Sequence, residues 1–103
     1  MTEFLSVYMT AASREEAEKI ALALVEEKLV ACANIFPGVL SVYRWEGKVE
    51  RANECAIIAK TTTNKFDALS QRVKELHSYE CPCVVALPIV AGSDEYLEWI
   101  RKE

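Results

Sequence analysis

Two long runs of strand-forming residues, joined by a short turn, constrain the fold of this 103-residue chain more than any other feature. The first run covers residues 31–45 and is broken only at Pro37-Gly38, and the second covers residues 49–61. Gly47, between the two runs, can adopt a positive φ angle without steric cost. The segment 45–48 therefore predicts a β-hairpin turn.

The predicted hairpin is longer than the body that carries it. A compact chain of this length has a radius of gyration near ~13 Å, hence a diameter of roughly 30–35 Å. About thirteen residues of strand extend roughly 44 Å. The tip holds Val42, Tyr43 and Trp45, side chains that are costly to leave in water on a protruding ribbon. We therefore expect copies of this chain to cover each other's hairpins.

The first 28 residues predict a strand followed by a helix. Residues 4–10 are rich in strand formers. Ser13 stands three residues before Glu16, a capping-box pattern that opens a helix ending near Lys28. The apolar residues of this helix recur at helical spacing. They are Ala17, Ile20, Ala21, Leu24 and Val25.

The second half of the chain predicts a helix, a strand and a last helix. Asn64 is expected to cap the first of these helices, which ends at residues 77–78. The near-continuous apolar run 83–89 indicates a strand buried on both faces and limited by Pro88. Gly92-Ser93 then opens a short C-terminal helix. The expected core positions of the first helix are Phe66, Leu69, Val73 and Leu76, and the last helix carries Tyr96, Leu97, Trp99 and Ile100.

The order strand, helix, strand, strand, helix, strand is that of the ferredoxin-like βαββαβ fold, here with an extra C-terminal helix. We expect a single α+β domain spanning residues 1–103, with an antiparallel sheet and two helices on one face. The other face of the sheet is then left bare. Because it carries apolar residues, the last helix or another subunit must cover it.

Composition excludes several classes of partner. The net charge of −4 and the lack of a Lys/Arg cluster disfavour nucleic acid and anionic membranes. The longest apolar run, residues 81–90, contains two prolines and is far shorter than the roughly twenty residues that span a bilayer. The N-terminus shows no secretory signal pattern. We therefore expect a cytoplasmic protein, without direct membrane insertion, whose four cysteines are reduced.

The segment 77–83 is the richest in chemistry. His77, Glu80, Cys81 and Cys83 offer borderline and soft ligands that suit copper or zinc. If the chain is extended here, the two thiols fall on the same side and could share a cation. The alternative is structural: His77 ends a helix, and Cys83 begins a buried strand as a small hydrophobic residue.

Other candidates lie outside this segment. Cys32 begins the first hairpin strand, where it is either a core residue or a ligand. Lys60 and Thr61 end the second hairpin strand, where they either bind a small anion or precede a helix cap. Aromatic residues with a polar group suit subunit interfaces first and a ligand cleft second. These residues are Tyr43, Trp45, Tyr79, Tyr96 and Trp99.

The sequence offers little for catalysis. There is one histidine and no glycine-rich phosphate loop among only three glycines. No nucleophile stands with a base and an orienting group in an evident pattern. We therefore expect no enzymatic activity.

Several segments resemble the CutA divalent-cation tolerance family, in order and spacing, over essentially the whole chain. They are residues 29–35 (LVACANI), 37–38, 41–48 (SVYRWEGK), 54, 60–61, 77–82 and 96–99. The resemblance implies homotrimers of ferredoxin-like subunits with interlocking hairpins and contacts between sheet edges. It also implies a link to tolerance of copper and other divalent ions, and a similarity to PII-type signalling trimers, which bind effectors in clefts between subunits.

Carried over by residue, the resemblance points to Cys32, His77, Tyr79 and Glu80 as functional positions. It places Tyr43, Trp45, Lys60 and Trp99 around the region between subunits. Two departures stand out. Ser78 replaces the family's usual proline, which is expected to loosen the turn that aims His77. Met9 stands near a cysteine that some members carry as a proposed copper ligand.

Three hypotheses follow. The first is a homotrimer for divalent-metal tolerance that binds copper or another divalent cation through His77, Glu80, Cys81, Cys83 and Cys32. The second is a PII-like module that binds a small effector in inter-subunit clefts lined by Tyr43, Trp45, Lys60, Thr61, Tyr79 and Trp99. The third is a trimeric scaffold or anchor without a ligand of its own.

Overall fold

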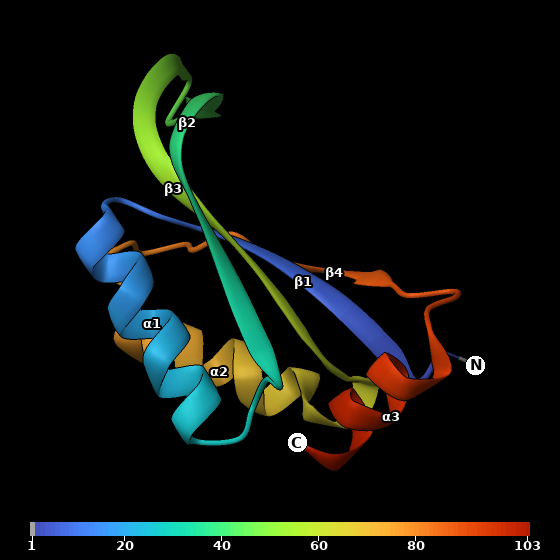
Figure 1. Cartoon of the computed structure of the whole chain (residues 1–103). Helices are drawn as coiled ribbons and strands as arrows, with labels where there is room; N and C mark the ends of the chain where they lie inside the picture. The colour runs from blue at the N-terminus through green and yellow to red at the C-terminus, as the bar shows by residue number, and fades with distance from the viewer. Residues whose placement is uncertain (1) are drawn as a thin grey trace.

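The computed structural model describes residues 2–103 and has the α+β, ferredoxin-like architecture that the sequence predicts (Figure 1). Its elements are β1 (Phe4–Ala11), α1 (Arg14–Glu26), β2 (Cys32–Trp45), β3 (Lys48–Thr62), the 3₁₀ turn η1 (Thr63–Lys65), α2 (Phe66–Leu76), β4 (Val84–Pro88) and α3 (Asp94–Lys102). The strands form one sheet in the order β2-β3-β1-β4, and each neighbouring pair is antiparallel.

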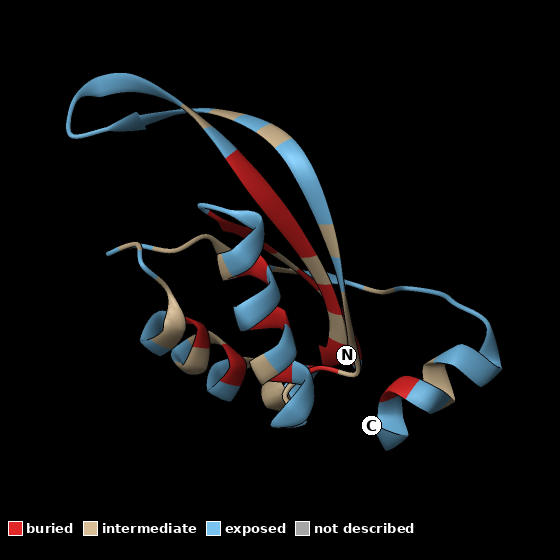
Figure 2. Ribbon diagram, turned by 60° about the vertical axis from the view of Figure 1, so that its left-hand side comes forward, coloured by how far each residue is buried: buried red, intermediate tan, exposed pale blue. Residues whose placement is uncertain are grey.

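The core lies between one face of the sheet and helices α1 and α2. Val7 is at its centre: it stands opposite Ala59 of β3 and Ala86 of β4. Alternate residues of each strand point toward the helices, as the period of two requires. The buried sheet and helix positions meet along this layer (Figure 2). The largest fully buried side chains include Met9, Ile20, Leu24, Ile57, Leu69 and Val73.

Helix α1 begins as predicted, with one exchange of partners. The Ser13 hydroxyl accepts a hydrogen bond from the Glu16 N–H at 3.1 Å. The Glu16 carboxylate bonds the N–H of Ala12, at 3.0 Å, instead of that of Ser13. The predicted core face is confirmed for the four residues Ala17, Ile20, Ala21 and Leu24. Val25 was wrongly placed there, since it is 40 % exposed at the end of the helix.

The hairpin has the predicted turn and bend. Glu46 and Gly47 have φ angles of 49° and 80°, so both central residues are in the positive-φ region that two-residue hairpin turns require. The pairing of β2 with β3 shifts register between Phe36 and Val39, where Gly38 has φ of 79°. The hairpin curls beyond the body of the molecule (Figure 1), and the longest extent of the whole chain, hairpin included, is 44 Å.

Two sequence predictions were wrong in detail. Asn64 does not cap α2: it lies inside η1, and its side-chain oxygen accepts a hydrogen bond from the Thr62 hydroxyl. Strand β4 is not buried on both faces within this chain, because Val85 and Leu87 are exposed. Both point away from the helices, on the sheet face that α1 and α2 do not cover.

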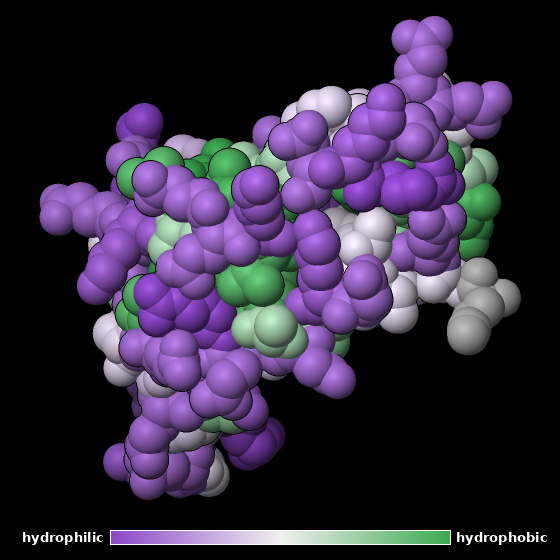
Figure 3. Space-filling model, turned by 90° about the horizontal axis from the view of Figure 1, so that it is seen from below, coloured by the Kyte–Doolittle hydropathy of each residue, from purple (hydrophilic) through white to green (hydrophobic). Residues whose placement is uncertain are grey.

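Helix α3 covers only one end of that second face. Ile100 is buried there, and the Arg101 guanidinium lies 5.2 Å from the centroid of the Phe4 ring. The rest of the face exposes apolar side chains, among them Phe36 and Leu87. The side of the molecule viewed from below is instead mostly hydrophilic, with small hydrophobic patches (Figure 3). Within residues 2–103, no helix is long and apolar enough to cross a membrane.

Candidate metal-binding and ligand-binding site

A hollow of about 570 Å³ lies where the curled hairpin, β1 and the segment before β4 meet. Its lining combines aromatic rings with carboxylates and two thiols. The hairpin bend and twist bring residues near the tip of β2 over the sheet face that the helices leave open. The lining residues are Tyr8, Thr10, Ser41, Val42, Tyr43, Trp45, Glu54, Tyr79, Glu80, Cys81 and Cys83.

Three of the predicted metal ligands, Glu80, Cys81 and Cys83, line this hollow together. Both thiols are free; Cys81 is exposed and Cys83 is half-buried. Burial raises the pKa of the Cys83 thiol, and the nearby charge of Glu54 raises it further. A soft metal ion that replaces the thiol proton removes that penalty, because the thiolate is the form that binds metal.

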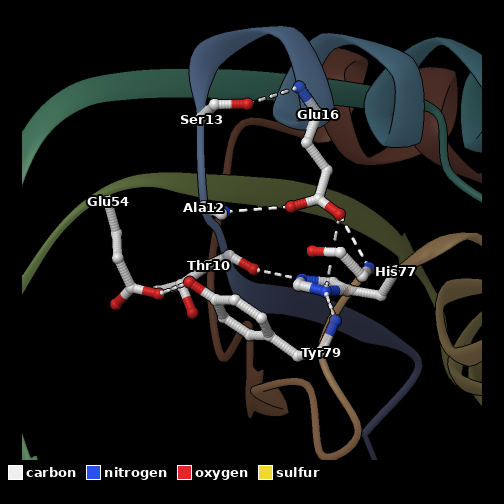
Figure 4. A network of polar contacts seen from close by, with 8 residues as sticks. Thr10, Ala12, Ser13, Glu16, Glu54, His77 and Tyr79 are labelled. Atoms are coloured by element: carbon white, nitrogen blue, oxygen red, sulfur yellow. Dashed lines mark hydrogen bonds and ion pairs between the residues drawn. The ribbon is translucent and has the colours of Figure 1, made fainter.

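Glu54 is the buried acid of the hollow. It belongs to β3, is only 9 % exposed, and accepts a hydrogen bond of 2.6 Å from the Tyr79 hydroxyl (Figure 4). Burial, followed by this hydrogen bond to a carboxylate, strongly raises the pKa of Tyr79. The phenol therefore stays protonated and fixes the Glu54 carboxylate at the wall of the hollow.

His77 lies beneath Tyr79 with its side chain fully buried. Its Nδ1 accepts a hydrogen bond of 3.0 Å from the Tyr79 N–H, so Nδ1 carries no proton. Its Nε2 then donates to the Thr10 carbonyl at 2.7 Å (Figure 4). Because both ring nitrogens already have partners, His77 would have to give up a hydrogen bond before it could bind a metal.

Glu16 ties the start of α1 to the turn after α2. Besides Ala12, its carboxylate accepts a hydrogen bond of 2.7 Å from the Ser78 N–H. Burial opposes ionisation of this carboxyl, but hydrogen bonds from Ala12 and Ser78 outweigh it and lower the pKa of Glu16. A proline at position 78 would lack this N–H. Ser78 therefore supplies a hydrogen bond that proline could not make, and this bond opposes the expected loosening of the turn.

Cys32 lies at the other end of the sheet, away from the hollow. Its Sγ is 3.3 Å from the hydroxyl of Tyr96 in α3. This hydrogen bond, together with burial, raises the pKa of Tyr96 to about 12. Trp99 packs beside Tyr96, with ring centroids 5.5 Å apart. Cys32 is thus separated within the chain from the other proposed metal ligands.

Lys60 and Thr61 do not form one anion pocket within the chain. Lys60 is on the open face of the sheet and donates to the Asn34 side chain at 3.2 Å. Thr61 is on the core face, is 1 % exposed, and donates to the Leu29 carbonyl at 2.7 Å. Its hydroxyl holds the loop before β2.

The structure therefore does not bring all the candidate residues together at one site. Tyr43, Trp45 and Tyr79 join Glu80 and the two thiols at the hollow. Among residues 2–103, no group of three or more His, Cys, Asp or Glu side chains is arranged to hold a metal ion. The sequence analysis missed the bond between Glu16 and the turn at Ser78, and the role of Glu54. A single carboxylate before the apolar run 55–59 was the signal for Glu54.

Comparison with known proteins identifies the family. The profile described as "CutA1 divalent ion tolerance protein" matches residues 5–103. The chain belongs to this family. It is 52 % identical over 96 residues to the divalent-cation tolerance protein CutA of Thermus thermophilus, covering 93 % of each chain. Over 94 residues it is also 52 % identical to the CutA of Archaeoglobus fulgidus, covering 91 % of each.

Solved CutA1 structures share the fold. The Oryza sativa CutA1 crystal structure superimposes with a TM-score of 0.95 at 44 % identity, covering 98 % of this chain and 93 % of that one. The Thermus thermophilus Cut A1 structure gives 0.94 at 50 % identity, covering 96 % of each. The ferredoxin-like arrangement and the long hairpin are therefore those of the CutA1 family.

Proposed function

We propose that the chain acts in tolerance of divalent metal ions, copper among them, as a non-enzymatic homotrimer in the cytoplasm. The observation that supports metal binding best is the gathering of Glu80, Cys81 and Cys83 in one hollow. Carboxylates and thiols together suit borderline and soft metals, which include copper and zinc. The family name supports the link to divalent ions.

Exposed apolar surface supports the assembly. Val42 and Val49 near the hairpin tip are 63 % and 64 % exposed, and Trp45 is 45 % exposed. The open sheet face adds Val85 and Leu87. Exposed apolar side chains on a hairpin and a sheet face are typical of protein–protein contact, and a copy of the same chain offers a matching hairpin and face.

Native mass spectrometry of the reduced protein tests assembly and binding together. At micromolar protein we expect three times the chain mass of 11.6 kDa, with added mass after incubation with Cu(I), Cu(II) or Zn(II). Val42→Asp should weaken the trimer. Leu22→Asp should not, because Leu22 is equally exposed, at 62 %, but lies on α1. A monomeric parent would refute the assembly, and no metal above background would refute binding.

A second candidate function is effector binding in the same hollow, favoured by its four aromatic rings. Tyr8, Tyr43, Trp45 and Tyr79 offer stacking surfaces. The lining contains Glu54 and Glu80 but no Lys or Arg, so a cationic aromatic ligand suits it better than an anion. Calorimetry with tryptamine and indole-3-acetate, which differ mainly in charge, should show binding of tryptamine only. Binding of neither would leave the scaffold role.

A further inference from the structure

We propose that Cys81 and Cys83 together form a Cu(I) site, in which two thiolates hold one ion at the wall of the hollow. This inference rests on the proposed metal function and specifies its ligands and oxidation state. It places the copper site of this chain on the segment before β4 and away from His77.

The backbone brings the two thiols to the same space. Val84 stands opposite Met9 and belongs to the core face of the sheet. Cys83, one residue earlier, therefore points to the opposite face, where it lines the hollow. Cys81 is two residues before it and lines the same hollow. The pair thus shares one concavity.

Pro82 makes this arrangement rigid. Its ring fixes its own φ at about −65°, and it biases the preceding residue, Cys81, toward extended backbone. Cys81 ends the bend at residues 78–81, and Pro82 is the single residue between it and Cys83, so the rigid proline sets how both side chains reach the hollow. Less conformational entropy is therefore lost when both thiols take one ion, because the backbone between them has little freedom to begin with.

The donors that remain available favour Cu(I) over divalent ions. The buried ring of His77 has both nitrogens in hydrogen bonds, and no group of three donors is arranged for a metal within residues 2–103. Zinc in proteins is almost always bound by four ligands, or by three and a water. Cu(I) is soft, is selected by thiolates, and is satisfied by two of them.

Aromatic side chains of Tyr8, Tyr43 and Trp45 line the hollow beside the two thiols. The step is a ligand exchange without redox change. Each thiol loses its proton to solvent, two Cu–S bonds form as the ligands that held the ion in solution leave, and the copper stays Cu(I).

The test is competition between the reduced chain and the Cu(I) chelator bicinchoninate under anaerobic conditions. We expect the parent to take a single Cu(I) per chain. Cys81→Ser and Cys83→Ser should each weaken Cu(I) binding by more than the roughly 10- to 100-fold loss that a mutated outer-shell partner causes. Cys32→Ser is the matched control, a half-buried thiol at the other end of the sheet, and should bind as the parent does.

X-ray absorption of the copper-loaded chain gives an independent reading, with sulfur ligands and no nitrogen expected. Unchanged Cu(I) affinity in the Cys81→Ser/Cys83→Ser variant, an equal loss in Cys32→Ser, or a histidine nitrogen at the copper would overturn the inference. In each of these cases the chain still binds copper, so the proposed function survives. A parent that binds neither Cu(I) nor Cu(II) would remove both.

Discussion

Replacing Glu16 should destabilise the fold through two lost hydrogen bonds. Its carboxylate accepts from the N–H groups of Ala12 and Ser78 at 3.0 and 2.7 Å. Hydrogen bonds to charged groups contribute about 1.5–3 kcal/mol each, and partial exposure of both donors brings them to the lower end. In Glu16→Ala the loosened turn lets water bond these N–H groups, which limits the loss. We therefore expect Glu16→Ala to lower the free energy of unfolding by about 2–3 kcal/mol. Glu16→Gln keeps one acceptor oxygen and should cost about half of that.

The pH dependence has a definite sign. The folded-state pKa of Glu16 lies below its ordinary value of 4.5, so its ionic contribution is fully present above that value. It is lost as pH falls through the lower folded-state pKa. The difference in unfolding free energy between parent and Glu16→Gln should therefore be constant near neutral pH and shrink in acid.

Denaturant unfolding at one fixed protomer concentration measures both effects, since an oligomer's apparent stability depends on concentration. Glu15→Gln is the control: Glu15 is one residue away, exposed and in the same first turn of α1, so its effect should stay within about 0.5 kcal/mol. If Glu16→Gln matched Glu15→Gln, or if its deficit were unchanged below the folded-state pKa, the proposed tie between α1 and the turn at Ser78 would be refuted.

Three further predictions concern single contacts. Tyr79→Phe leaves the buried Glu54 without its 2.6 Å donor and should lower the free energy of unfolding by about 1–3 kcal/mol in denaturant. Tyr8→Phe, at a ring that lines the same hollow, is the control. Equal effects of the two variants would contradict the role of the Tyr79 hydrogen bond. Gly47→Ala places a Cβ at φ of 80° and should lower stability by about 1 kcal/mol, visible as a lower Tm, whereas an unchanged Tm would contradict the turn geometry. Cys32→Ala removes the partner that raises the pKa of Tyr96 to about 12, so ultraviolet titration should show one tyrosine ionising closer to its ordinary value; an unchanged titration curve would exclude that hydrogen bond.

Much of the fold could be read from periodicity because hydrophobic spacing and turn chemistry agree along most of the chain. Ser13, the bend at Pro37-Gly38 and the positive-φ turn at Gly47 are local signals, and each is confirmed. Asn64 failed because its side chain bonds the neighbouring Thr62, two residues away, within a 3₁₀ turn. The apolar run of β4 suggested two buried faces, but one chain covers only one of them.

The sequence predicted the types of residue at the site better than it predicted which of them lie together in space. The spacing predicts Cys81 and Cys83 on one side of the chain if the segment is extended; the structure has a bend that ends at Cys81, and both thiols still line one hollow. The burial of His77 depends on Thr10 and Tyr79, and Thr10 is distant in sequence, so no local pattern reveals it. Thr61 was expected near a ligand, but strand alternation turns it into the core opposite Leu5.

Copper tolerance in cells tests the central claim most directly. Cells that lack their own protein of this family would express the parent, Cys81→Ser/Cys83→Ser, or Cys32→Ser at matched levels, and their growth would be measured across a copper series. The parent and Cys32→Ser should restore growth at copper concentrations that stop cells expressing none of these proteins. The double variant should not restore it. Equal rescue by all three proteins, or rescue by none, would contradict a role for this chain in metal tolerance through its thiol pair.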